Sequence, residues 1–384
     1  MRAKDGMARP RLPHLAATLA VTMALLLGGA LGGPHHPVAA RAVETLTGAG
    51  ATFPYPLYSR YFDVYHRLTG VRVNYQSIGS GGGQRQLRER TVNFGASDAF
   101  LTDEQLAQYP GPVLHIPTAL GAVVVTYNLR GIDRPLRFTG ELLADIYLGE
   151  VVRWNDPRIQ QLNPDVTLPP LPVVVVHRSD GSGTTFVWTD YLAKVSPRWR
   201  QRVGVGTSVA WPTGLGGKGN EGVAGLVRQI PGAIGYIEMV YARSESMSYG
   251  MVRNRAGRWV LPTLESVSAA AAVEMPPDTR VSLTDTAAPD GYPIAGLTWL
   301  LVYQDLSLST QSVGQARALA QLLWWIVHEG QRYNESLHYA RLPEPVVRRA
   351  EALLTSLHFR GEPLLAGAGA GADQPGPSAG EGAS

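Results

Sequence analysis

The stretch from Ser179 to Phe186 (SDGSGTTF) places the strongest constraint on the fold of this 384-residue chain. It joins the apolar run Val173–Val176 to an amphipathic segment that predicts a helix from Ser182 to Val195. A strand, a glycine-bearing turn, hydroxyl residues and a helix together direct free backbone N–H groups and the positive end of the helix dipole at one point. Arg178, just before the turn, adds a planar cation suited to two oxygens at once. The stretch therefore predicts an α/β chain with an anion site beyond this strand.

Two earlier segments have the same design. Thr52 and Phe53 follow a short strand-like run, and Ser80 follows the alternating run Val71–Tyr75 within the glycine-rich Gly79–Gly83. Each segment offers a hydroxyl and unpaired N–H groups. Plain N-capping, by Thr52 for example, would explain any single helix start. Because ligands of open α/β sheets bind beyond the carboxyl ends of the strands, we expect the three starts to meet at one site.

Asp98 ends a third strand-like stretch, and a carboxylate there would sense whether an anion bears a proton. It could accept a hydrogen bond from protonated phosphate, whereas sulfate has no proton to give near neutral pH. Sites that leave a buried polar group unpaired reject close analogues by roughly 10⁴-fold or more. Asp180 could hold the guanidinium of Arg178 inward. The simpler alternatives are that Asp98 is a turn residue and that Arg178 is a surface residue.

Composition excludes several classes of function. The net charge of +3 resides in residues 1–40, where four basic residues outweigh Asp5, so the remainder sums to zero and nothing indicates a nucleic-acid partner. The absence of cysteine excludes disulfides, thiolate metal sites and a lipid-anchored N-terminal cysteine. The nine histidines lack metal-binding spacing. We expect a monomer with no metal and no cofactor.

The two ends of the chain differ from its middle. Residues 1–42 read as a cleavable export signal, with basic residues before the apolar Leu15–Leu31 and cleavage after Ala40 or Ala42. Residues 366–384 are rich in Gly, Ala, Pro and Ser, and predict a disordered tail.

Between these ends we expect two lobes with largely parallel sheets, because short β-branched runs alternate with amphipathic helices. The chain would cross near residues 118–122, and a new strand would begin at Val123. The predicted division is residues 43–120 in lobe 1, 121–290 in lobe 2 and 291–365 returning to lobe 1.

Five segments carry a resemblance to a known family. The chain resembles the phosphate-binding proteins of ABC-type phosphate transporters, from about Thr45 to Leu357. The segments are Thr47–Pro54, Asn74–Ser80, Phe94–Asp98, Asp180–Thr184 and Gly214–Asn220. Gly81 stands where that family commonly has a second serine, and Phe100 where proline is usual.

The resemblance implies a two-lobed, type II periplasmic binding protein with inorganic phosphate in the cleft between the lobes. It also implies delivery of that phosphate in the periplasm to the permease and ATPase subunits of an ABC transporter. Asp98 would accept the phosphate proton and Asp180 would orient Arg178. The implied ligand-binding residues are Thr52, Phe53, Ser80, Asp98, Arg178, Ser182, Gly183 and Thr184.

Two other functions remain open. Ser182 could be the nucleophile of a phosphatase or esterase, for which Asp180 and His177 are the nearby candidate bases. Alternatively, the protein could be a phosphate sensor or store that meets no transporter.

Overall fold

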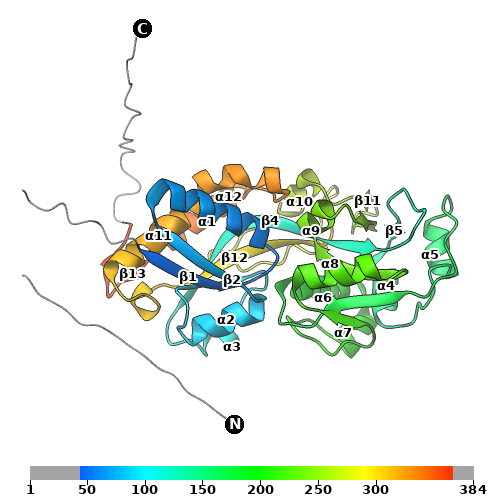
Figure 1. Ribbon diagram of the computed structural model, residues 1–384, viewed down its shortest axis with the longest axis horizontal. Coiled ribbons are helices and arrows are strands. Elements are labelled where there is room, and N and C mark those ends of the chain that lie inside the picture. The colour runs from blue at the N-terminus through cyan, green and yellow to red at the C-terminus, as the bar shows by residue number, and fades with distance from the viewer. Residues whose placement is uncertain (1–43, 366–384) are drawn as a thin grey trace, which may run out of the picture. The chain divides into compact units, whose positions relative to one another are not determined.

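The computed structural model describes residues 44–365. The predicted export signal and the predicted tail lie outside the described residues. The architecture is a mixed α/β fold around a nine-stranded sheet of order β2-β1-β3-β12-β4-β8-β6-β7, with β9 paired to β4 (Figure 1).

The N-terminal strands are parallel, as the sequence predicts. β1 (Thr45–Gly50) lies between β2 (Arg72–Ser77) and β3 (Phe94–Ser97). α1 (Tyr55–Thr69) and α2 (Ser80–Arg88) connect them. Figure 1 shows α1 and α12 (Glu344–Thr355) above these strands, and α2 and α3 (Asp103–Leu106) below them. α1 buries an apolar face and ends at Gly70, whose φ of 78° is the left-handed conformation that favours glycine.

Two long antiparallel strands form the middle of the sheet. β4 (Val113–Tyr127) pairs with β12 (Ala295–Tyr303) through its residues 113–122, and with β8 (Ala233–Glu238) through its residues 123–127. The prediction of a new strand at Val123 is therefore wrong, because one strand runs through the change of partner. The prediction of a largely parallel sheet holds only for the outer strands.

We call the strands on one side of this change, together with the turns and helices that directly follow them, the first strand group, and those on the other side the second strand group. The first contains β2, β1, β3, β12 and residues 113–122 of β4. The second contains residues 123–127 of β4, β8, β6 (Val174–Arg178) and β7 (Leu215–Gly217), of which β8, β6 and β7 are parallel to one another.

Helices cover the second strand group, and aromatic residues fill the space beneath them. The helices that cover this group include α4 (Gly140–Tyr147), α6 (Gly183–Val195), α7 (Pro197–Arg202) and α8 (Gly219–Gln229). Trp188 of α6 stacks on Tyr236 of β8 with ring centroids 5.1 Å apart, and Tyr147 packs against both. This packing fixes the start of α6 relative to the end of β6.

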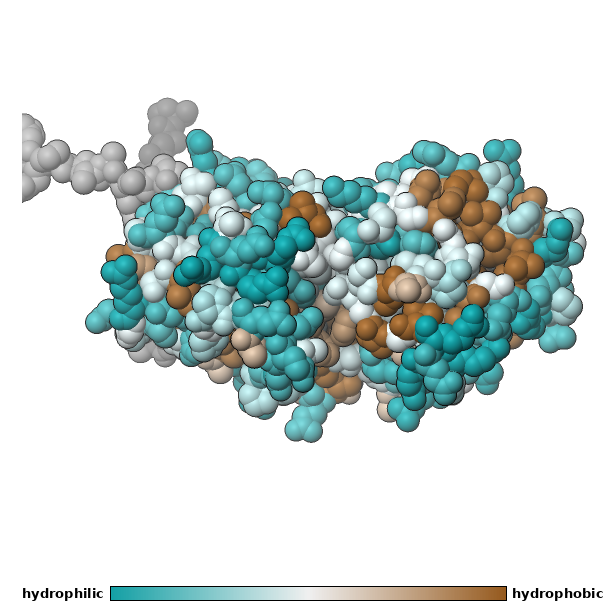
Figure 2. Space-filling model, turned by 90° about the horizontal axis from the view of Figure 1, so that it is seen from below, coloured by the Kyte–Doolittle hydropathy of each residue, from teal (hydrophilic) through white to brown (hydrophobic). Residues whose placement is uncertain are grey.

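The remaining elements complete the described chain. They are β5 (Arg137–Phe138), α5 (Pro157–Leu162), α9 (Met239–Ser244), β9 (Ser248–Tyr249), β10 (Met251–Arg253), β11 (Trp259–Val260), α10 (Leu264–Ala270), α11 (Val313–Val327), β13 (His358–Phe359), β14 (Glu362–Pro363) and three short 3₁₀ turns within Leu306–Leu337. Seen from below, the surface is mostly hydrophilic, and its brown areas gather on the half that holds the second strand group (Figure 2). Exposed large apolar side chains of that half include Val152, Val205 and Leu215.

Candidate functional site

The predicted site residues lie at the carboxyl ends of parallel strands. Thr52 and Phe53 follow β1, Ser80 follows β2, Asp98 follows β3, and Arg178 ends β6. All are buried, as are Ser182, Gly183 and Thr184 at the start of α6. The structure thus brings residues of both strand groups to one place, as the arrangement of the strands requires.

The start of α6 is built as predicted. Ser182 is its N-cap, with an extended backbone and an Oγ that accepts a hydrogen bond from the Thr185 N–H at 3.0 Å. The next N–H, that of Gly183, donates to Ser80 Oγ at 3.0 Å and so joins the two strand groups. A Cβ on Gly183 would lie 2.5 Å from Asp98 Oδ2 and 2.6 Å from Ser80 Oγ, so this close approach requires glycine.

Two family departures noted in the sequence lie at the same junction. The Gly81 N–H donates to the Gly181 carbonyl at 2.9 Å, and a Cβ on Gly81 would lie 3.1 Å from Gly181 Cα. The ring of Phe100 meets that of Phe186 edge-on, with centroids 5.3 Å apart. Both departures therefore pack the two strand groups against each other.

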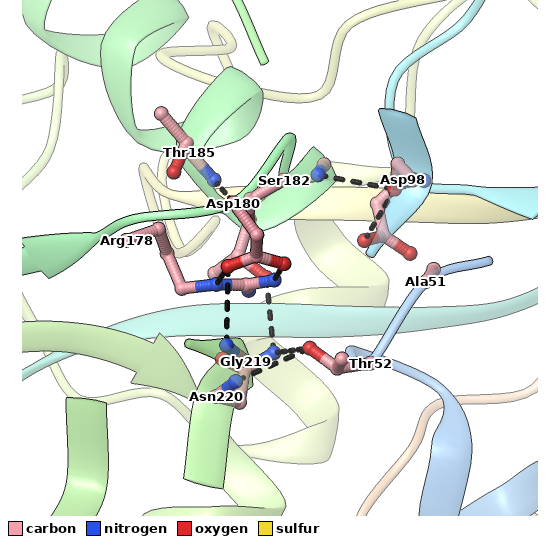
Figure 3. A network of polar contacts seen from close by, with 12 residues as sticks. Ala51, Thr52, Asp98, Arg178, Asp180, Ser182, Thr185, Gly219 and Asn220 are labelled. Carbon is pink, nitrogen blue, oxygen red and sulfur yellow. Dashed lines mark hydrogen bonds and ion pairs between the residues drawn. The ribbon is translucent and has the colours of Figure 1, made fainter. Parts of the chain in front are cut away.

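Asp180 orients Arg178, as predicted. The Nε of Arg178 donates to Asp180 Oδ1 at 2.8 Å and its Nη2 to Oδ2 at 2.6 Å, a two-pronged ion pair (Figure 3). Burial acts to raise the pKa of Asp180, but hydrogen bonds and the charge of Arg178 outweigh it and hold this pKa below its ordinary value of 3.8. The remaining Nη1 lies 3.4 Å from Thr184 Oγ1. A buried cation is thereby fixed beside the start of α6.

Asp98 is a buried carboxyl that can titrate near neutral pH. Its Oδ1 accepts a hydrogen bond from Thr298 Oγ1 at 2.7 Å, and Ser80 Oγ lies 3.5 Å from its Oδ2. Burial raises the pKa of Asp98 to about 7, although Thr298, the charge of Arg178 and Ser80 act to lower it. Asp98 can therefore accept a hydrogen bond when ionised and donate one when protonated.

The predicted capping role of Thr52 is wrong. α1 begins at Tyr55 with Pro54 at its N-cap position and no side-chain cap, because Pro54 and Pro56 have no N–H to donate in this turn. Thr52 Oγ1 instead accepts hydrogen bonds from Asn220, from the backbone N at 3.2 Å and from Nδ2 at 2.8 Å. Figure 3 shows Thr52 facing Asn220, whereas Asp98 lies near Ser182 and away from Asn220.

Phe53 and Ser80 are not helix N-caps either. Phe53 is wholly buried, its carbonyl accepts from the Tyr339 hydroxyl at 2.6 Å, and its ring fills the space where a Cβ on Gly121 would stand. α2 begins at Ser80 itself, after Gly79 at φ 83°, which leaves the Ser80 hydroxyl to face Asp98 and Gly183.

Sequence reasoning missed Asn220 and Thr298 as site residues. Asn220 follows β7, the strand end that the prediction overlooked, because a three-residue strand leaves no clear pattern. Thr298 lies within β12, and only the antiparallel register of Trp299 opposite Ser97 brings it beside Asp98. Asn220, as a polar residue after a strand end, could have been detected from the sequence. The register that brings Thr298 beside Asp98 could not.

The geometry offers Ser182 no base from the two predicted candidates. Both Asp180 oxygens face Arg178. His177 Nδ1 lies 3.0 Å from the Arg178 carbonyl, and its ring stacks on Trp211. Neither residue has a hydrogen bond to Ser182 among those found for residues 44–365.

The described residues also bear on metals and membranes. Between residues 44 and 365, no group of three or more His, Asp or Glu side chains is placed to hold a metal ion. None of the helices in that part of the chain has the length and apolar character needed to cross a bilayer.

Comparison with known proteins places this chain in a family. The PBP superfamily domain matches residues 37–329. The phosphate-binding protein PstS of Pasteurella multocida is 43% identical over 313 residues, which cover 80% of this chain and 89% of that protein. PstS of Xylella fastidiosa (strain 9a5c) is 44% identical over 315 residues, 81% of this chain and 85% of the relative. The chain belongs to the PstS family of phosphate-binding proteins.

Solved structures agree with this fold. PfluDING, a high-affinity periplasmic phosphate-binding protein bound with phosphate, superposes with a TM-score of 0.65 at 22% identity, covering 80% of this chain and 93% of that one. A phosphate-binding protein from Stenotrophomonas maltophilia gives a TM-score of 0.62 at 16% identity, with the same coverage. The mixed α/β fold of this PstS family member is the type II periplasmic binding fold, as the resemblance implied.

Proposed function

We propose that this protein binds inorganic phosphate in the periplasm and delivers it to an ABC-type phosphate importer. The observation that carries the proposal is the convergence of Asp98, which follows β3 of the first strand group, with Arg178 and the start of α6, which belong to the second. The guanidinium and the N–H groups supply positive potential, while Asp98 supplies an acceptor for a proton. The PstS names of the relatives support phosphate as the ligand.

The charge pattern favours phosphate over sulfate. Both anions are tetrahedral and would gain from the same donors. Hydrogen phosphate can donate its proton to ionised Asp98, whereas sulfate would leave this buried carboxylate unpaired and repelled. Rejection by roughly 10⁴-fold is typical of sites that leave such a group unsatisfied.

We further propose that Thr52, Phe53, Ser80, Asp98, Arg178, Ser182, Gly183 and Thr184 contact the phosphate. They would belong to two lobes, residues 43–120 with 291–365, and residues 121–290. The change of partner along β4 after Ala122 supports this division. Because ligand-binding groups come from both lobes, phosphate would bind the closed state better and shift the population toward it.

The protein would act as a monomer that is exported by a cleavable signal, and it would meet the permease and ATPase subunits of the importer. It would catalyse no reaction. The hydrogen bond from Thr185 N–H to Ser182 Oγ supports a capping role for this serine rather than a nucleophilic one.

Isothermal titration of the mature protein with phosphate, sulfate and arsenate tests the proposal. We expect one phosphate per chain, with micromolar or tighter affinity, and sulfate weaker by at least about 10³-fold. Equal affinity for sulfate, or no heat with phosphate, would refute it. Phosphate-ester hydrolysis by the purified protein that Ser182→Ala abolishes would instead favour the enzyme.

A further inference from the structure

The side-chain amide of Asn220 joins hydroxyls of the two strand groups. Asn220 is fully buried in the first turn of α8. Its Nδ2 donates to Thr52 Oγ1 at 2.8 Å and to Thr184 Oγ1 at 3.1 Å. The first threonine follows β1 and the second lies in α6, so one amide group connects both sides of the junction.

The orientation of this amide is fixed by its third contact. The backbone N–H of Glu238 faces the amide oxygen, Oδ1, at 2.9 Å. A backbone N–H can only donate, so the oxygen must face Glu238 and the NH₂ group must face the threonines. One amide hydrogen is then donated to Thr52 Oγ1 and the other to Thr184 Oγ1.

This arrangement decides what the two hydroxyls can do next. A threonine hydroxyl has two lone pairs and one hydrogen. Thr52 Oγ1 accepts from both the backbone N and the Nδ2 of Asn220. Thr184 Oγ1 accepts from Asn220 Nδ2 and from Arg178 Nη1 at 3.4 Å. Each oxygen has filled its acceptor sites, so each hydroxyl has only its hydrogen left to offer.

We propose that Asn220 is a positioning residue that makes Thr52 and Thr184 obligate hydrogen-bond donors toward the bound anion. This inference rests on the proposed phosphate binding and deepens it. The side of the site nearest Asn220 then accepts only oxygens without a proton, and a proton-bearing oxygen must face Asp98. The site distinguishes phosphate with one proton from phosphate with two, since a second P–OH would meet a donor.

Three variants test this role. Asn220→Ala removes the amide and frees one acceptor site on each threonine, since the backbone N of residue 220 and Arg178 Nη1 remain. Asn220→Asp keeps the shape and the acceptor for the Glu238 N–H, but its carboxylate accepts hydrogen bonds and turns the threonine hydrogens away from the anion. Asn254→Ala is the matched control, since Asn254 is also buried and also makes three side-chain hydrogen bonds, to Pro289, Gly291 and Arg258.

Phosphate affinity is measured by isothermal titration at about pH 5.5 and about pH 8.5, between which phosphate changes from mainly monoanion to mainly dianion. The informative quantity is the ratio of the Kd of each variant to the Kd of the unmodified protein at the same pH. Titration of groups common to both proteins largely cancels in this ratio. The ionisable groups on the elements packed here are Glu221, next to Asn220 in the chain, and Glu238, whose backbone N–H contacts it. Arg178 shares Thr184 with Asn220, and Asp180 accepts from the preceding Gly219 N–H. Asp98 and Tyr241 interact electrostatically with Glu238.

We expect Asn220→Ala to weaken binding about 10- to 100-fold at the higher pH, the worth of a hydrogen bond to charge. At the lower pH the loss falls below about 10-fold, because a freed threonine oxygen can accept from the second P–OH. Asn220→Asp loses more than Asn220→Ala at the higher pH, and Asn254→Ala binds like the unmodified protein.

A Kd ratio that is the same at both pH values would reduce Asn220 to a structural residue and overturn the inference. Normal binding by Asn220→Asp, the variant that best preserves packing, would overturn it as well. If the unmodified protein itself binds no phosphate, the proposed function fails together with this inference. If it binds phosphate and the Asn220 variants bind equally well, only the role of Asn220 is wrong.

Discussion

Replacing Asp98 with asparagine separates its proton-sensing role from its place in the fold. The amide of the Asp98→Asn variant keeps an oxygen that can accept from Thr298 Oγ1, which donates to Asp98 at 2.7 Å in the unmodified protein. The substitution removes the titration and the negative charge, and it adds N–H donors that can face an anion. The variant therefore changes the electrostatics of the site with little change in volume.

The effect on folding follows from the pKa of Asp98. Burial raises this pKa from the ordinary 3.8 to about 7, so the folded protein holds the proton more tightly than the unfolded chain. The stability that Asp98 contributes is fully present below about pH 3.8 and is lost as the pH rises through about 7. The difference corresponds to at most about 4 kcal/mol. The ligand-free variant should therefore match the unmodified protein near pH 4 and exceed its stability above pH 7.

The effect on binding follows from the same charge. Above about pH 7, ionised Asp98 repels sulfate, whereas the amide of the Asp98→Asn variant can donate to it. We expect the ratio of sulfate Kd to phosphate Kd to fall by at least about 100-fold, which corresponds to about 3 kcal/mol. In the unmodified protein, sulfate rejection should itself weaken as the pH falls below about 7, because protonated Asp98 becomes a donor.

Two assays check this reasoning. Calorimetric titrations with phosphate and with sulfate, between about pH 5 and about pH 8.5, give the selectivity. Urea unfolding of the ligand-free proteins over the same range gives the stability. If selectivity were unchanged and both proteins showed the same dependence of stability on pH, Asp98 would have neither the raised pKa nor the sensing role.

Three further variants test neighbouring parts of the site. Arg178→Ala should weaken phosphate binding by about 2–5 kcal/mol in calorimetry, since it removes a buried cation and leaves Asp180 unpaired; near-normal affinity would exclude Arg178 from the site. Gly183→Ala should fold yet bind phosphate at least about 10-fold more weakly, because its Cβ would stand 2.5 Å from Asp98 Oδ2; unchanged affinity would contradict the close approach of α6. Thr298→Val removes a hydrogen bond that lowers the pKa of Asp98, so the onset of sulfate rejection should move to higher pH, and an onset at the same or lower pH would argue against this contact.

Local chemistry made several site residues predictable. The capping residue Ser182 is set by the strand-turn-helix order of its own segment, and its contact with Thr185 follows from helix geometry. The pair of Arg178 and Asp180 is two residues apart in the sequence, so its geometry is local as well. Asp98 was predictable because it directly follows a buried strand.

Features that depend on pairing between distant segments were not predictable. The continuity of β4 through Gly121 depends on partners in β12 and β8. The glycine there is explained by the Phe53 ring, which leaves no room for a Cβ at Gly121. Thr298 reaches Asp98 only through sheet register. The hydroxyl of Thr52 could not be assigned to Asn220 from sequence, because the two residues are 168 positions apart.

Residues of both strand groups should surround one tetrahedral anion. A crystal structure of the mature protein with bound phosphate tests it most directly. We predict a single phosphate within hydrogen-bond distance of Thr52, Ser80, Arg178 and Thr184, with one oxygen facing the carboxyl of Asp98. Phosphate held by one strand group alone, or at a site remote from Asp98, would contradict the account.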